Sequence, residues 1–251
     1  MNILDEIVAN TKSKLEIKKS RIGLKELLAK IDNKSIKESN FKKSLLNKDE
    51  AIIAEIKKAS PSAGIISEDF NPVSKAKEYE SFGAAALSIL TEEDYFLGSI
   101  NYLVNVKEVS DLPILRKDFI IDAYQIYESK LIGADCILLI AAILSDEQLQ
   151  KFTNIADQLG LDYIIEIHNK DELSRVETFS KAIIGVNNRD LKTFKVDINN
   201  SILLRNEFKQ DNVFVSESGI KSRKDIDMLK ENNINVFLIG ESLMKGDFFE
   251  T

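Results

Sequence analysis

Residues 51–62 read AIIAEIKKASPS, a short apolar run that passes directly into a cluster of polar residues. Five further apolar runs end in the same way, within residues 113–118, 163–166, 183–190, 213–219 and 236–242. Runs of this length and β-rich composition are typical of buried parallel strands. Polar groups at one end of every strand indicate that one end of the sheet carries the chemistry. In a closed parallel barrel, that end holds the active site.

The spacing of these runs predicts the fold class. Runs with strand character begin near residues 51, 84, 113, 135, 162, 182, 213 and 235, and amphipathic segments lie between them. Such alternation predicts parallel strands joined by right-handed crossovers, and eight strands can close a barrel. The alternative is a doubly wound open sheet, which usually carries a glycine-rich turn after its first strand. Here that turn reads KKASPSAG, so we predict an α/β fold of the (β/α)8 TIM-barrel class.

The domain organisation follows from the length and from a change of character near residue 46. A chain of 251 residues has the typical size of one such barrel. Residues 1–46 show helical spacing of apolar residues and no strand character, which predicts two or three helices. We therefore expect residues 1–251 to form a single barrel domain, with 1–46 a helical N-terminal extension over one of the two mouths.

Charge and composition exclude several classes of protein. A formal net charge of −7 argues against non-specific nucleic-acid binding, which needs a basic face. It still allows an anionic small substrate in a locally positive pocket. No apolar stretch reaches the roughly 18 residues of a membrane helix, and Asp5 and Glu6 stand where a signal peptide has positive charge. We expect a cytoplasmic protein without nucleic-acid or membrane partners.

Cysteine and histidine are each present once, as Cys136 and His168. A single cysteine excludes an internal disulfide and suits a reducing cytoplasm, and Cys136 is predicted to be a core thiol. A single histidine makes a His-based triad or a His-rich metal site unexpected. Acid–base chemistry would then fall to Lys, Glu, Asp or Tyr, and we interpret His168 as an incidental loop residue.

Charged residues interrupt the strand runs at three places. Glu55 and Lys57 lie two apart at the end of the first strand, so the period of two directs both to the same face. A structural ion pair is the alternative interpretation. Lys117 and Glu166 are each embedded in apolar sequence, where a buried charge needs a partner. A surface lysine is the alternative for Lys117, whereas the lysines are the obvious partners for Glu166.

Small and polar residues at other strand ends predict a phosphate site. Gly219 and Gly240 follow the seventh and eighth strands, where such barrels commonly bind phosphate through main-chain N–H groups. The alternative is that both glycines serve only tight turns. Ser60 could add a hydroxyl donor. Phe96, after the second strand, could pack on a planar substrate or cap the core.

Read together, these motifs resemble those of the indole-3-glycerol phosphate synthase family. The matching segments occur in family order: AEIKKASPSAG at 54–64, LSILTEEDYFLGS at 87–99, LPILRKDFIID at 112–122, GADCILLI at 133–140, IIEIHN at 164–169, IGVNNRDL at 184–191, VSESGI at 215–220 and FLIGESLM at 237–244. The resemblance implies ring closure of 1-(2-carboxyphenylamino)-1-deoxyribulose 5-phosphate to indole-3-glycerol phosphate, with release of carbon dioxide and water, in tryptophan biosynthesis. It implies no metal and no organic cofactor.

The resemblance also implies roles for individual residues. Lys117 resembles the general acid that activates the substrate carbonyl, and Glu166 resembles the acid–base group of the later dehydration. Lys57 is similar to a lysine that contacts the substrate and shares in proton transfer, and Glu55 is similar to the carboxylate that orients the lysines. The remaining matches are Asn187, Arg189, Glu217, Ser218 and Phe96 for substrate binding, and Ser60, Gly219, Gly240 and Glu241 for phosphate binding.

Simple acid–base reasoning supports these roles. Lysine is protonated at neutral pH, so acting as an acid requires no shift of its pKa. We expect a neighbouring lysine to lower the pKa of Lys117, and partial burial to raise the pKa of Glu166. No role is assigned to Arg116. The chain stops soon after residue 249, so the eighth helix is expected to be short.

Two rival functions are disfavoured by the residues at the strand ends. A phosphoribosyl isomerase of the same barrel class would usually carry a Cys–Asp or Asp–Asp pair at the first and fifth strand ends, and those positions hold Glu55, Lys57 and Glu166 here. A non-catalytic barrel that binds an anionic ligand or serves as a partner subunit is disfavoured because the lysine and glutamate set is intact. We expect a monomer, with association with other tryptophan-pathway enzymes left open.

Overall fold

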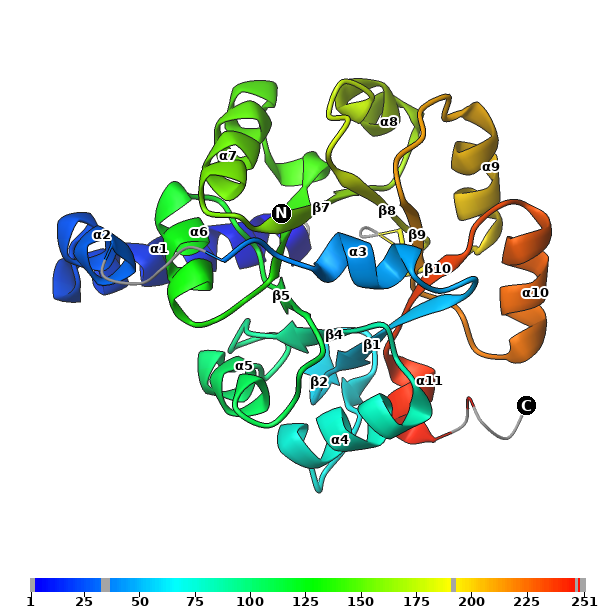
Figure 1. Cartoon of the computed structure of the whole chain (residues 1–251), viewed down its shortest axis with the longest axis horizontal. Helices are drawn as coiled ribbons and strands as arrows, with labels where there is room; N and C mark the ends of the chain where they lie inside the picture. Colours follow the sequence, from blue (N-terminus) through cyan, green and yellow to red (C-terminus); the bar gives the residue numbers. More distant parts are fainter. Residues whose placement is uncertain (1–2, 33–36, 191–192, 247, 249–251) are drawn as a thin grey trace.

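The computed structural model describes residues 3–32, 37–190, 193–246 and 248. Within these residues, eight parallel strands close into a barrel in the order β1-β10-β9-β8-β7-β6-β5-β4, and helices surround it (Figure 1). The strands are β1 (Ala51–Ile56), β4 (Ala86–Leu90), β5 (Ile114–Lys117), β6 (Cys136–Ile140), β7 (Asp162–Ile167), β8 (Ile183–Asn187), β9 (Phe214–Glu217) and β10 (Val236–Ile239). The predicted (β/α)8 barrel is confirmed, and the strands begin at or within two residues of the predicted positions.

Helices follow each of the eight strands, and several of them begin at well-formed caps. The helices are α4 (Pro72–Phe82), α5 (Ile100–Lys107), α6 (Ala123–Leu131), α7 (Asp146–Gln158), α8 (Lys170–Val176), α9 (Asn199–Glu207), α10 (Arg223–Glu231) and α11 (Glu241–Lys245), with a 3-10 turn η1 (Ala141–Ile143) after β6. Asp122 and Ser145 begin α6 and α7 with capping boxes that satisfy the free N–H groups of the first turn. The last helix, α11, has five residues and is short, as expected.

Side-chain alternation along the strands divides the core into two parts. On β1, Ala51 and Ile53 belong to the cluster inside the barrel, whereas Ile52 and Ile56 pack in the cluster between strands and helices. Because successive side chains point to opposite faces, Glu55 continues the inward series. Cys136 is fully buried inside the barrel, as predicted for a core thiol.

The N-terminal helices contact both mouths of the barrel rather than one. They are α1 (Ile3–Arg21), α2 (Leu24–Asp32) and α3 (Phe41–Leu46). Phe41 and Leu45 of α3 are buried with the amino ends of the strands, and α3 lies across the centre of the barrel in Figure 1. Ile3 and Ile7 of α1 line the cavity at the opposite mouth. The extension therefore runs along the side of the barrel from one mouth to the other.

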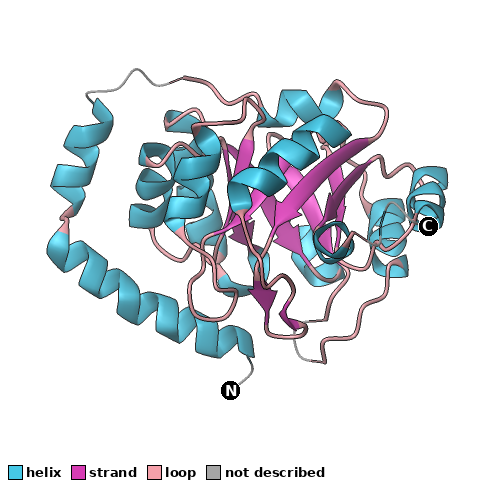
Figure 2. Ribbon diagram, turned by 90° about the horizontal axis from the view of Figure 1, so that it is seen from below, coloured by secondary structure: helices cyan, strands magenta, loops and turns pink. Residues whose placement is uncertain are grey.

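A short hairpin that the sequence did not predict follows β1. It pairs β2 (Ala59–Ser60) with β3 (Gly64–Ile65) in antiparallel fashion. Figure 2 shows the hairpin at the same end of the barrel as the start of α1. This is the carboxyl end of the parallel strands, where the polar clusters were predicted to gather. Of the helices in the described ranges, none carries an apolar stretch long enough to cross a bilayer.

Candidate active site

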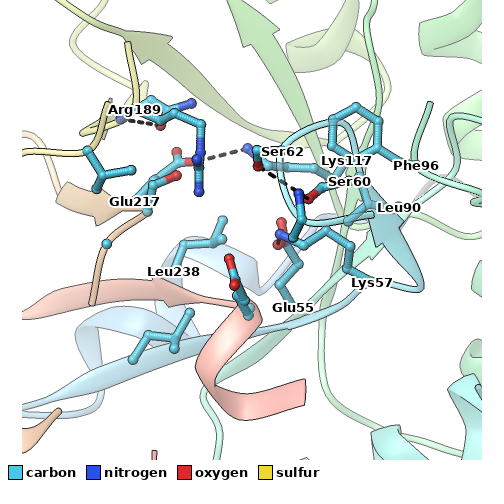
Figure 3. Close-up of a pocket in the computed structure, with 18 of the residues that line it drawn as sticks. Glu55, Lys57, Ser60, Ser62, Leu90, Phe96, Lys117, Arg189, Glu217 and Leu238 are labelled. Carbon is cyan, nitrogen blue, oxygen red and sulfur yellow. Dashed lines mark hydrogen bonds and ion pairs between the residues drawn. The ribbon is translucent and has the colours of Figure 1, made fainter. Parts of the chain in front are cut away.

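A cavity of about 1060 Å³ opens at the carboxyl-terminal mouth of the barrel. Figure 3 shows Glu55 and Lys57 at the end of β1, Lys117 on β5 and Glu217 on β9 facing this cavity. All of the candidate residues named from the sequence line it: Glu55, Lys57, Ser60, Phe96, Lys117, Glu166, Asn187, Arg189, Glu217, Ser218, Gly219, Gly240 and Glu241. Residues far apart in the chain thus meet in one space, because parallel strands direct their carboxyl ends to the same side.

Four charged side chains form one layer across the barrel interior. Glu55, Lys117, Glu166 and Glu217 come from β1, β5, β7 and β9, which are alternate strands of the closed order. In such barrels, each interior layer consists of four side chains from alternate strands, and bulky apolar residues usually fill it. Here the uppermost layer carries one ammonium and three carboxylates.

Lys117 is the centre of this layer. Its Nζ donates hydrogen bonds to Glu166 Oε2 at 2.9 Å and to Glu217 Oε2 at 2.8 Å. Burial lowers the pKa of Lys117, but the charges of Glu166, Glu217 and Glu55 outweigh it, so the pKa is raised. The expectation that a neighbouring lysine lowers this pKa is wrong. Lys57 Nζ instead lies 2.5 Å from Glu55 Oε2.

The two carboxylates that share Lys117 differ in their acidity. For Glu166, burial raises the pKa, but the positive charges of Lys117 and His168 reverse the effect and leave the pKa lowered. For Glu217, burial and the charge of Glu166 together outweigh the attraction of Lys117 and raise the pKa to about 7. Sequence reasoning therefore predicted the raised pKa for the wrong glutamate, because it could not see which carboxylate has the additional cation.

Asn187, at the end of β8, contacts the Glu166 oxygen that Lys117 does not contact. Asn187 Nδ2 donates to Glu166 Oε1 at 3.2 Å, and Asn187 Oδ1 accepts the backbone N–H of Arg189 at 3.0 Å. The Arg189 guanidinium donates to the Phe194 carbonyl at 3.3 Å. Asn187 thus orients the charged layer, and Arg189 lines the rim of the cavity.

Two glycines at this mouth leave room for carboxylates. A Cβ on Gly185 would lie 2.2 Å from Glu217 Oε1, and a Cβ on Gly240 would lie 2.3 Å from Glu55 Oε2. Gly240 has φ −123°, so the turn itself does not require glycine there. The backbone conformation of the turn therefore does not explain why residue 240 is a glycine, whereas the close approach of the Glu55 carboxylate does.

The loop after β9 has a strained backbone. Ser218 has φ +68° and Gly219 has φ +86°, and a non-glycine residue in the left-handed region is uncommon outside functional sites and turns. Across the mouth, Ser60 Oγ accepts the backbone N–H of Ala63 at 3.2 Å. The Glu241 carboxylate pairs with Lys245 at 2.6 Å, which leaves the main chain of the β10–α11 turn as its contribution to the cavity.

One wall of the cavity is aromatic. Phe96 and Phe119 lie with ring centroids 6.0 Å apart, and both line the cavity. The loop that carries Phe96 is held by Glu92, whose carboxylate accepts the backbone N–H groups of residues 94, 95 and 96 at 2.7–3.0 Å. Phe96 therefore lines the cavity, in agreement with its predicted position at the barrel mouth.

Two residues beside the site were missed by sequence reasoning. His168 was interpreted as incidental, but its Nε2 lies 3.4 Å from Glu166 Oε1 and its side chain is largely buried. The spacing of two from Glu166 was the available signal, because it places both on one face of the strand. Arg116, which had no role, is fully buried and pairs with Asp118 at 2.9 Å and Glu128 at 2.8 Å, so it fixes the end of β5 next to Lys117.

Comparisons with known proteins agree with this geometry. The model of the family described as indole-3-glycerol phosphate synthase matches residues 4–250. A relative of that name from Endomicrobium trichonymphae is 50% identical over 97% of this chain and 95% of the relative. Another from Acetivibrio thermocellus is 50% identical over 97% of this chain and 94% of the relative. The solved tryptophan synthase α subunit of Legionella pneumophila aligns with a TM-score of 0.59 at 13% identity, over 83% of this chain and 88% of that one, which shows the fold alone.

Proposed function

Because the chain belongs to the indole-3-glycerol phosphate synthase family, we propose that the charged layer at the carboxyl-terminal mouth carries out that family's reaction. The protein is a carboxy-lyase of tryptophan biosynthesis. It closes the ring of the carboxyphenylamino deoxyribulose phosphate to form indole-3-glycerol phosphate, and it releases carbon dioxide and water. The roles of its individual residues are part of our proposal.

The first step needs an acid at the substrate carbonyl. An aromatic ring carbon attacks the ketone carbon, and negative charge develops on the ketone oxygen. Lys117 is buried, charged and directed into the cavity, so it is suited to protonate that oxygen as it develops charge. Carbon dioxide then leaves from the ring carbon that made the attack, and its bonding electrons return to the ring and restore the aromaticity of the benzene ring. Loss of the hydroxyl as water in the next step completes the aromatic five-membered ring.

The second step needs a base and then an acid. A proton leaves the substrate carbon next to nitrogen, and the hydroxyl on the former ketone carbon departs as water. Glu166 is suited to take the carbon proton and to return it to the departing hydroxyl. Its pKa is lowered while Lys117 contacts it. When Lys117 turns to the substrate oxygen, that contact weakens and the pKa of Glu166 rises toward the working range.

The surrounding residues bind the anionic ends and the ring of the substrate. Lys57, oriented by Glu55, and Arg189 supply positive charge for the carboxylate and the phosphate. Glu217 and Ser218 line the substrate space, and Asn187 orients Glu166. The main chain at Gly219, Gly240 and Glu241, with the Ser60 hydroxyl, forms the proposed phosphate cradle. Phe96 and Phe119 offer an aromatic wall for the phenyl ring.

One observation carries the assignment of roles: inside the cavity, the Lys117 ammonium donates hydrogen bonds to both Glu166 and Glu217. The pKa of Glu166 is lowered, whereas that of Glu217 is raised. A single-turnover experiment tests the assignment by following carbon dioxide release and indole fluorescence together. In the wild type, we expect the two signals to rise in step. In Glu166→Gln, we expect carbon dioxide to be released well before indole appears, because dehydration lacks its base. Equal slowing of both signals, or no indole from the wild type, would contradict the roles of Lys117 and Glu166.

We also propose that the protein works as a monomer in the cytoplasm. The most exposed large apolar side chains, Leu46, Ile65 and Leu203, lie on α3, β3 and α9 and so on different parts of the surface. Scattered residues of this kind do not form the continuous patch that stable interfaces use. Sedimentation at micromolar concentration should give the mass of one chain, and a concentration-dependent dimer would contradict the proposal.

A further inference from the structure

The single histidine of the chain lies between two carboxylates. His168 Nδ1 is 3.2 Å from Glu172 Oε2, and its Nε2 is 3.4 Å from Glu166 Oε1. The same Glu172 oxygen accepts the backbone N–H of His168 at 2.8 Å, and Asn169 Nδ2 donates to the other oxygen at 2.7 Å. Glu172 thus holds the ring from the side of α8, while Glu166 meets it from the side of the cavity.

These contacts determine where the protons sit. An ionised carboxylate only accepts hydrogen bonds, so the Nδ1 that contacts Glu172 carries a hydrogen. A neutral ring with that hydrogen would leave the Nε2 lone pair 3.4 Å from the Glu166 carboxylate, and the two would repel. Nε2 is buried and has no hydrogen-bond partner among the described residues, so its contact with Glu166 Oε1 is an ion-pair distance. A proton on Nε2 turns the repulsion into attraction, so the geometry favours an imidazolium at this contact.

The two carboxylate oxygens of Glu166 have different partners, and this gives them different roles. Oε1 is held by Asn187 Nδ2 at 3.2 Å and faces His168. Oε2 accepts a hydrogen bond from Lys117 at 2.9 Å, and Lys117 leaves when it turns to the substrate. Oε2 is then the oxygen free to exchange a proton with the substrate, and Oε1 is the anchored one.

We propose that His168 is a positioning residue for Glu166: as an imidazolium clamped by Glu172, it holds Oε1 and leaves Oε2 as the reactive oxygen. This inference rests on the proposed role of Glu166 in dehydration. The proton that Oε2 takes from the substrate carbon returns to the departing hydroxyl to form water, so the His168 proton is not consumed and the ring needs no co-reactant.

The charged groups around the ring favour this state. The carboxylates that act on His168 come from three elements, namely Glu166 on β7, Glu172 on α8 and Glu217 on β9, while Asn200 of α9 donates to its backbone carbonyl at 3.0 Å. Burial lowers the pKa of His168, but these carboxylates outweigh burial and raise it. Loss of the ring proton at high pH should therefore slow turnover, above the ordinary histidine range of about 6.5.

Nuclear magnetic resonance of the ring nitrogens tests the inference without any substrate. Because the chain has one histidine, a ¹⁵N-labelled sample freed of its affinity tag gives one set of ring signals. We expect an imidazolium at pH 7 and, after titration, a ring protonated on Nδ1. In Glu172→Gln, the midpoint should fall by roughly one pH unit. An ordinary midpoint that Glu172→Gln leaves unchanged, or a neutral ring protonated on Nε2, would overturn the inference.

Kinetics supply the second test, with a matched control on the same helix. Asp171 is exposed and adjacent to Glu172, so Asp171→Asn removes the same charge without touching the ring. Glu172→Gln should move the alkaline limb of kcat to lower pH, and Asp171→Asn should leave it in place. His168→Gln should remove that limb while retaining most turnover at pH 7, whereas His168→Ala should lower kcat about 10-fold or more with little change in KM. Unchanged limbs in Glu172→Gln and His168→Gln would refute the inference.

The two proposals fail in different ways. If the ring signals behave as expected but the wild type makes no indole, the proposed function fails and the His168–Glu166 contact stands. If the wild type is active but its ring titrates normally, only the positioning role fails. Circular dichroism of each variant confirms that a lost signal does not reflect unfolding, and the wild-type titration requires no variant at all.

Discussion

At the amino-terminal mouth of the barrel, Phe41 and Leu45 of α3 close the interior with fully apolar contacts. At the carboxyl-terminal mouth, the interior ends in Lys117 and three glutamates. The same eight strands form both mouths. Burial of apolar side chains stabilises the folded protein at the amino-terminal mouth, whereas burial of charged side chains destabilises it at the carboxyl-terminal mouth. Removing a charged group from water costs several kcal/mol, whereas burying a large apolar side chain contributes about 1.5–3 kcal/mol. Stability and chemistry are thus separated along the barrel axis, and mutations can test that separation.

The largest expected effect is loss of activity at the charged mouth. Lys117→Ala removes the proposed general acid and should lower kcat by about 10³-fold or more, measured by indole fluorescence at saturating substrate. Lys58→Ala is the matched control, because Lys58 neighbours the site in sequence but does not line the cavity. It should stay within about twofold of the wild type. Near-normal turnover in Lys117→Ala would remove the basis of the assignment.

The opposite mouth should respond with stability instead. Phe41 is completely buried, so Phe41→Ala should destabilise the protein by about 3–5 kcal/mol in urea unfolding. Its kcat per folded molecule should change little, because the residue lies at the other end of the strands. Phe82→Ala, at a position on α4 that is 37% exposed, should cost clearly less than Phe41→Ala. A large fall in kcat with unchanged stability would show that the two mouths are coupled.

An effect of intermediate size is expected on the pH dependence of stability, because the pKa of Glu217 is shifted in the folded protein. The pKa of Glu217 is raised from 4.5 to about 7 in the folded state, so the folded protein binds the proton more tightly than the unfolded chain. That stabilisation is complete below pH 4.5 and is lost as the pH rises through 7. Glu217→Gln keeps the neutral form at all pH values. It should therefore gain stability relative to the wild type between these limits, by a few kcal/mol at most.

Urea unfolding of both proteins at the acid and alkaline ends of that range measures the effect. The difference between the two proteins, rather than either curve alone, isolates Glu217 from the other titrating groups. A difference that is the same at both pH values would mean that folding does not shift the pKa of Glu217, and the contrast in acidity with Glu166 would then be lost.

The smallest effect is expected at the rim, where α1 meets the loop after β4. Lys14 pairs with Glu93 at 3.0 Å and Asp94 at 2.6 Å, and all three side chains are more than one third exposed. Exposed pairs contribute about 0–1 kcal/mol and weaken with salt. Lys14→Met should therefore cost less than about 1 kcal/mol, and the cost should shrink in 1 M salt. Lys12→Met, at an exposed position on the same helix, is the control, and equal losses in both would leave the ion pair without a measurable role.

Much of this architecture was predictable because it depends on local pattern. The strand starts follow from runs of apolar residues, and the common face of Glu55 and Lys57 follows from the period of two. Lys117 and Glu166 were found because a charge inside an apolar run is unusual. The β2–β3 hairpin was missed because each of its strands has two residues, too few to form a pattern.

The acidity of the site was not predictable from local pattern. Burial alone raises the pKa of both Glu166 and Glu217. The two differ because His168 and Asn187 lower the pKa of Glu166, whereas Glu166 and Glu55 raise the pKa of Glu217. Arg116 was passed over for a similar reason, since its partners Asp118 and Glu128 meet it only after β5 and α6 have packed.

The amino-acid sequence by itself determined that this chain forms eight strand–helix units and that each strand ends in reactive residues, because apolar periodicity and residue type are properties of neighbouring positions. Tertiary structure alone decided which carboxylate keeps its proton, which histidine nitrogen faces Glu166, and that the N-terminal helices reach both mouths. Those outcomes depend on distances of a few ångströms between groups far apart in the chain, where Coulomb energy and desolvation change most steeply.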